Sequence, residues 1–157
     1  MARTTPREIR LASAVLAICG VALIVVAIIH LWISPLLYTW FGRGVGSALP
    51  VYGPPFLLNH VVVGLLLLPL GVNTLIASFG VRAGDQRAWR IACVNSLAVA
   101  TLPLLLVAIM RGPDYTAVPF RVAEVLVTLA AFGMLAAVLL ARTHMGFARA
   151  AATISDA

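Results

Sequence analysis

Residues 11–33 read LASAVLAICGVALIVVAIIHLWI, a run of 23 residues without Asp, Glu, Lys or Arg. Three further apolar runs follow, at 56–79, 91–110 and 122–140. A helix of about 20 residues, at about 1.5 Å per residue, crosses the roughly 30 Å of hydrocarbon in a bilayer. The runs lack the two-residue alternation of a membrane barrel, and lipid offers no partner to an unpaired backbone group. The sequence therefore predicts an all-α integral membrane protein with four transmembrane helices.

The composition supports a single membrane domain. Hydrophobic residues make up 62% of the chain and charged residues 10%, whereas roughly a quarter of residues are charged in an average soluble protein. Short connections predict an antiparallel, up-down four-helix bundle, with loops too short for a soluble catalytic domain. The expected layout is one domain over 1–157, helices at about 11–33, 56–79, 91–110 and 121–141, and tails at 1–10 and 142–157.

The positions of the arginines predict the orientation, because short cytoplasmic loops retain basic residues. Eight arginines lie in the two tails and the loop between the second and third helices, and three lie in or beside the other two loops. Both termini are therefore expected in the cytoplasm. All eleven basic residues are arginine, and we interpret this bias as that of a GC-rich bacterial gene, which predicts a bacterial cytoplasmic membrane.

The formal net charge of +6 would suggest nucleic-acid binding in a soluble protein. Here the arginines sit at the ends of apolar runs, so the expected partner is the lipid bilayer and nucleic acid is excluded. The loop after the second helix carries Arg82, Arg87 and Arg90 beside Trp89. We expect these three arginines to contact lipid head groups.

Two similar segments place asparagines on neighbouring helices. Val72-Asn73-Thr74-Leu75 lies in the second run and Val94-Asn95-Ser96-Leu97 in the third. Both asparagines lie about 7 to 10 Å from the inner boundary, so a hydrogen bond between Asn73 and Asn95 is the simplest expectation. Contact with a polar substrate is the alternative.

Three ionisable residues lie inside the expected helices at one depth near the outer surface. His30 is near the end of the first helix, His60 about a turn and a half into the second, and Glu124 about one turn into the fourth. Ionisable groups within a membrane are expensive, and their default interpretation is functional. Two imidazoles and a carboxylate suit a divalent metal with open coordination positions, or proton transfer to a quinone-like molecule.

A structural role is the competing interpretation of these residues. Glu124 can pair with Arg121 along one helix face, and the histidines can bond backbone carbonyls, Asn59 or interfacial water. Because the spacing is not specific to any ligand, no cofactor and no resident metal is predicted. His30, His60 and Glu124 remain weak candidates as metal ligands.

The chain shows no Ser-His-Asp or Cys-His set, Walker-type loop or zinc-spaced cysteine cluster. A stripe of small residues, Gly133, Ala137 and Ala141, allows another helix to approach the fourth one closely, within the chain or in another subunit. The leading hypothesis is a non-enzymatic subunit or accessory protein of a larger membrane complex, partnered by other subunits or its own copies. The alternative is a small enzyme or carrier for a quinone- or lipid-like ligand at the His/His/Glu layer.

Overall fold

The computed structural model describes residues 6–33, 36, 54–109 and 118–155, and the side chains of 6–32, 36, 61–105 and 124–143. Within these residues the protein is all-helical, with no strand. Its helices are α1 (Arg7–Ile28), continued by the π-helical η1 (Ile29–Ile33), α3 (Pro54–Arg82), α4 (Gln86–Ile109) and α5 (Val118–Ser155).

The described residues contain four helical segments that are long and apolar enough to cross a membrane. They are Arg7–Trp32, Val61–Arg82, Gln86–Leu105 and Glu124–Thr143. The expectation of an all-helical chain with four helices able to span a membrane is therefore confirmed. Helix α5 runs for 38 residues to Ser155, which is about 57 Å at 1.5 Å per residue. Its last turns thus continue as helix through most of the expected C-terminal tail.

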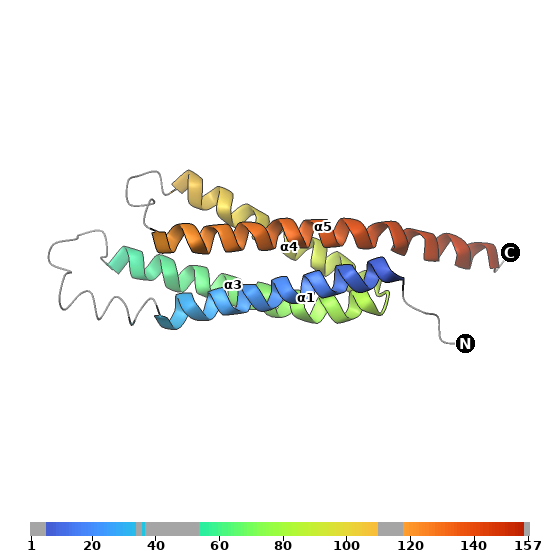
Figure 1. Cartoon of the computed structure of the whole chain (residues 1–157), viewed down its shortest axis with the longest axis horizontal. Coiled ribbons are helices and arrows are strands. Elements are labelled where there is room, and N and C mark those ends of the chain that lie inside the picture. The colour runs from blue at the N-terminus through green and yellow to red at the C-terminus, as the bar shows by residue number, and fades with distance from the viewer. Residues whose placement is uncertain (1–5, 34–35, 37–53, 110–117, 156–157) are drawn as a thin grey trace.

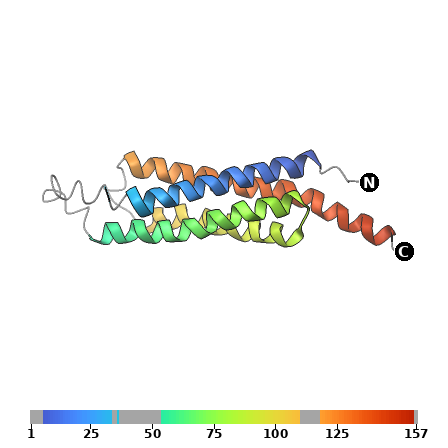
Figure 2. The ribbon, with the colours of Figure 1, turned by 90° about the horizontal axis from the view of Figure 1, so that it is seen from below.

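The four helices form a bundle in which each packs against two neighbours. Helix α1 contacts α3 and α5, and α4 contacts the same two helices from the other side. Figures 1 and 2 show the start of α1, the α3–α4 connection and the end of α5 at the same end of the bundle. Pro69 and Pro103 lie within α3 and α4, and both helices continue through them.

Small residues spaced seven apart bring α1 and α3 together. Ser13 lies opposite Ser78, Gly20 opposite Gly71, and Ala27 opposite Gly64. All six residues are buried. Each step of seven along α1 matches a step of seven back along α3, so the two helices run antiparallel. A seven-residue repeat keeps one face of a helix against its partner over several turns.

The approach is close enough to exclude a side chain at the glycines. A Cβ atom on Gly20 would lie 2.9 Å from the Leu75 nitrogen and 3.0 Å from the Gly71 oxygen. One on Gly71 would lie 2.9 Å from the Gly20 oxygen. At Ser13 the hydroxyl donates to the Ser78 carbonyl at 2.9 Å. Close backbone contact of this kind is how membrane helices gain van der Waals packing without a hydrophobic driving force.

A tight turn fixes α4 beside α3. Gly84 has φ of 80°, the Asp85 nitrogen donates to the Gly80 carbonyl at 2.9 Å, and the Gly84 nitrogen donates to Val81 at 3.0 Å. This pair of bonds is a Schellman motif, which needs a residue free to adopt positive φ. Asp85 then caps α4 by accepting from the Arg87 nitrogen at 2.8 Å. The two helices therefore leave the turn as antiparallel neighbours.

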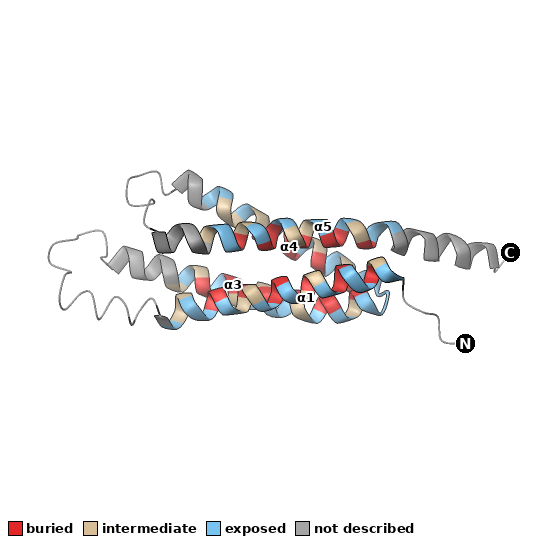
Figure 3. Ribbon diagram, in the orientation of Figure 1, coloured by how far each residue is buried: buried red, intermediate tan, exposed pale blue. Residues whose placement is uncertain are grey.

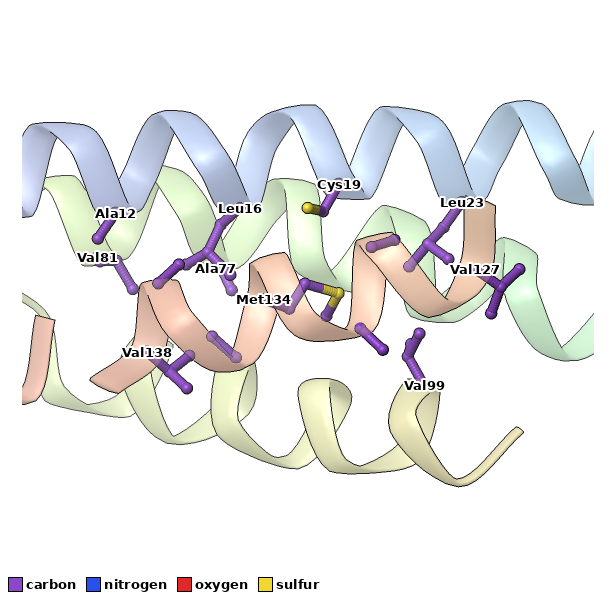
Figure 4. Packing of buried hydrophobic residues seen from close by; sticks show 14 of the residues in the cluster. Ala12, Leu16, Cys19, Leu23, Ala77, Val81, Val99, Val127, Met134 and Val138 are labelled. Carbon is purple, nitrogen blue, oxygen red and sulfur yellow. The ribbon is translucent and has the colours of Figure 1, made fainter. Parts of the chain in front are cut away.

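All four helices contribute to one apolar core. The buried residues lie along the inner faces of the helices (Figure 3). Leu16 and Leu23 of α1, Leu67 of α3, Val99 of α4 and Met134 of α5 are almost completely buried. Figure 4 shows the cluster between the helices. The interior is thus filled by aliphatic side chains and a methionine, which adapts to irregular gaps.

The small-residue stripe on α5 finds its partner within the chain. A Cβ atom on Gly133 would lie 3.1 Å from the Cys19 sulfur of α1. Ala137 and Ala141 are buried in the core. The stripe therefore serves the packing of this chain.

Replacing Gly71 by alanine should destabilise the protein by about 1 to 3 kcal/mol, because the added methyl group meets the Gly20 oxygen and the Ile24 nitrogen, backbone atoms that cannot move aside as a flexible side chain can. Helix propensity alone predicts that the substitution stabilises the protein, since alanine is favoured over glycine in a helix by about 1 kcal/mol. Unfolding of the purified protein in detergent measures the difference. Leu65→Ala, at an exposed position on the same helix, should change stability by no more than about 0.5 kcal/mol. A Gly71→Ala variant as stable as the natural chain would contradict the tight contact.

Candidate functional site

His30 lies in the π-helical segment that ends the first span. Its Nδ1 is 2.8 Å from the Val26 carbonyl oxygen, and the ring is half-buried. Because a carbonyl oxygen can only accept, Nδ1 donates the hydrogen of this bond. Isolated π-helical turns are frequent at functional sites. The segment thus orients the His30 ring.

The α1–α3 register places position 60 at about the level of His30. Ala27 faces Gly64, and His30 is three residues beyond Ala27 while His60 is four residues before Gly64. Because α1 and α3 run antiparallel, the backbone at positions 30 and 60 lies at about the same level along the two helices. The side chain of His60 lies outside the described residues.

Glu124 reaches a similar depth on α5. Gly133 lies against Cys19, so these two residues mark a common level on α5 and α1. Glu124 lies nine residues before Gly133, about 14 Å along α5 from that level. His30 lies eleven residues beyond Cys19, about 16 Å along α1 from it. The Glu124 side chain is half-buried. The Arg121 side chain, its expected ion-pair partner, lies outside the described residues.

The described side chains do not assemble a metal centre. No group of three or more His, Cys, Asp or Glu residues comes together among them. The structure therefore brings positions 30, 60 and 124 to one depth on three helices, while a site containing all three side chains stays a prediction.

The asparagine layer near the other end has a different partner from the expected one. Asn95 is buried, and its Nδ2 donates to the Thr74 hydroxyl at 3.3 Å. That hydroxyl donates in turn to the Leu70 carbonyl at 2.7 Å. Asn73 is exposed on the outside of α3. The polar contact between α3 and α4 thus uses Asn95 as predicted, with Thr74 in the place expected for Asn73.

The other buried hydroxyl groups are satisfied by backbone carbonyls. Ser78 donates to Leu75 at 2.6 Å, and Ser96 donates to Ala92 at 2.6 Å. Such bonds let a hydroxyl group enter an apolar environment without an unpaired donor. Each of these two bonds lies within one helix, so the hydroxyl groups are paired inside the bundle and are not free to bind a ligand.

Trp89 has a structural role beyond the expected interfacial one. Its indole Nε1 donates to the Val138 carbonyl at 2.9 Å, linking α4 to α5. The arginines of the same region, Arg82, Arg87 and Arg90, are exposed at the end of α3 and the start of α4. Their exposure leaves them accessible to surrounding head groups.

Two features were missed by reading the sequence. The first is the heptad of small residues on both α1 and α3, and the second is the tryptophan link. The signal for the first was present, because Ser13, Gly20 and Ala27 recur at seven-residue spacing. The bond from Trp89 to the backbone of α5 could not be predicted from the sequence, since every residue has a backbone carbonyl that could accept it.

Comparison with known protein families, with curated proteins and with solved structures gives no match for this chain.

Proposed function

We propose that the protein is a non-enzymatic subunit or accessory protein of a larger membrane complex. The observation that carries this proposal is the filled interior. Leu16, Leu23, Met134 and Val99 occupy the space between the helices, and the buried polar side chains bond within the chain. A protein whose described interior is occupied by its own side chains acts through its surfaces and ends.

The protein is proposed to lie in a bacterial cytoplasmic membrane, up-down, with both termini in the cytoplasm. Six described arginines support this orientation, since they gather at the end of the bundle that holds the start of α1 and the α3–α4 turn. They are Arg7, Arg10, Arg82, Arg87, Arg90 and Arg142. Each arginine near an anionic surface contributes roughly 1 kcal/mol.

Cysteine labelling tests this orientation. In a background with Cys19 and Cys93 replaced by serine, an Ala83→Cys variant should react with a membrane-impermeant maleimide in inside-out vesicles and not in right-side-out ones. Ala83 is exposed in the α3–α4 turn. A Ser47→Cys variant, in the loop expected on the other side, should show the opposite pattern. Labelling of Ala83→Cys from the outside would reverse the proposed topology.

Purification in a mild detergent tests the subunit proposal. A tagged chain should elute with a stoichiometric partner or as a homo-oligomer of defined size, because function through a surface requires a lasting contact. Co-expression of the same chain with two different tags separates the two cases: recovery of both tags identifies self-association. A monodisperse monomer without a partner would contradict the proposal.

The π-helical segment supports a second candidate function, a site for a quinone- or lipid-like ligand near the outer leaflet. It holds the His30 ring by the bond from Nδ1 to the Val26 carbonyl. Glu124 and position 60 share its depth. An imidazole and a carboxylate at one level could exchange a proton with a lipophilic molecule entering from the bilayer.

Alanine substitution tests this second candidate. His30→Ala, His60→Ala and Glu124→Ala should each lower the amount of lipophilic ligand retained, as measured by native mass spectrometry of protein extracted from its own membrane. His144→Ala, which changes the remaining histidine near the opposite end of α5, is the matched control. Unchanged ligand content in all three variants would remove the proposal.

A further inference from the structure

Asn73 places an amide on the outside of the bundle inside the membrane span. It lies nine residues before Arg82 in the span Val61–Arg82, which is about 14 Å from that end. The side chain is exposed. Leu66 and Ile76, one to two turns away, are also exposed, by 49% and 63%. The amide therefore sits among lipid-facing apolar side chains, well inside roughly 30 Å of hydrocarbon.

The surroundings of Asn73 differ from those of three hydroxyl residues in the spans. Thr74, Ser96 and the exposed Thr101 each donate to a carbonyl of their own helix. The side-chain amide of Asn73 makes no hydrogen bond with any residue that the structure describes. An amide without a partner in an apolar medium costs several kcal/mol. A monomer in lipid would leave this group unsatisfied.

The exposed face around Asn73 has the spacing of a helix-pairing seam. Leu66, Pro69, Asn73 and Ile76 follow one another at intervals of three, four and three residues, and all four are exposed. This is the a/d pattern by which two helices pack along a common line. Asn73 occupies an a-type position. A single asparagine at such a position selects register and partner in paired helices.

We propose that this face of α3 binds the same face of a second copy of the chain, forming a parallel dimer with Asn73 of each copy hydrogen-bonded to the other. The proposal rests on the proposed subunit function and names its partner. A carboxamide is both donor and acceptor, so it is complementary to itself. A twofold axis along the membrane normal can bring the two amides together for two reciprocal bonds.

Depth favours a second copy over a different protein. Two identical chains inserted in the same orientation hold Asn73 at equal depth by construction. A different partner would need its own polar group at that level on an otherwise apolar helix. Arg82, which is expected to contact head groups, lies about 14 Å away along α3, so those head groups are not at the depth of the amide.

Cross-linking in native membranes tests the dimer. In the Cys19→Ser/Cys93→Ser background, Ile76→Cys should form a disulfide-linked dimer on oxidation, because position 76 lies on the seam one turn from Asn73. Ile18→Cys is the matched control. Ile18 is 69% exposed on α1 and lies at the level of Asn73 in the α1–α3 register, so it should remain monomeric.

Substitution of Asn73 tests the role of the amide. Adding Asn73→Leu to the cross-linking variant should weaken dimerisation by about tenfold, the effect of losing interhelical hydrogen bonds worth 1 to 2 kcal/mol. Asn73→Gln, which keeps the amide, should retain the dimer. The unfolding of the Asn73→Leu monomer in detergent should stay unchanged, because Asn73 bonds no described residue.

Three results would overturn the dimer. These are absence of cross-linking at position 76, an equal dimer fraction for Asn73→Leu, and cross-linking of Ile76→Cys to a different protein. Cross-linking to a different protein would contradict the dimer but agree with the subunit function. A chain that is also monomeric and without a partner in mild detergent would contradict both the dimer and the subunit function.

Discussion

The contact between α1 and α3 is the constraint on which the bundle depends. In lipid, helices gain little from burying apolar surface, so they associate where their backbones approach closely. Gly20 and Gly71 permit that approach because each faces backbone atoms of the other helix at a distance that excludes even a methyl group. Helix α1 is then fixed against α3, its other flank receives α5 at Cys19, and the Gly84 turn places α4 beside α3. The four positions follow from two close contacts of α1 and one tight turn.

Polar groups follow a simple pattern around this frame. The inward-facing polar groups are hydroxyls and one amide. The hydroxyls of Ser13 and Thr74 donate to backbone carbonyls, and the amide of Asn95 donates to the Thr74 hydroxyl. This arrangement strengthens helix contacts without opening space for a solute. Among the residues that the structure describes, His30 in its π-helical segment and Asn73 on the exposed side of α3 lie outside this inward-facing set. The proposed activities of the molecule are therefore placed at its outer end and on its outer surface.

The candidate site was predictable in depth and not in rotation. Counting residues from the ends of the apolar runs, at about 1.5 Å per residue, gives His30, His60 and Glu124 the same expected depth. Which way each side chain points depends on the rotation of its helix. One residue corresponds to about 100° around the axis, and the asparagine layer shows the consequence: Asn73 points outward while the next residue, Thr74, meets Asn95.

The sequence by itself determined that the described chain is all-helical with four segments able to span a membrane, because apolar runs of this length satisfy both the bilayer and the backbone only as helices. It also placed a loop between the second and third helices, which the structure narrows to the turn at Gly84 and Asp85. Only the tertiary structure decided which faces meet, which small-residue stripe is used within the chain, and that Asn73 is left outside. Those outcomes depend on helix rotation and register, which emerge from packing several helices at once and are not encoded in any one of them.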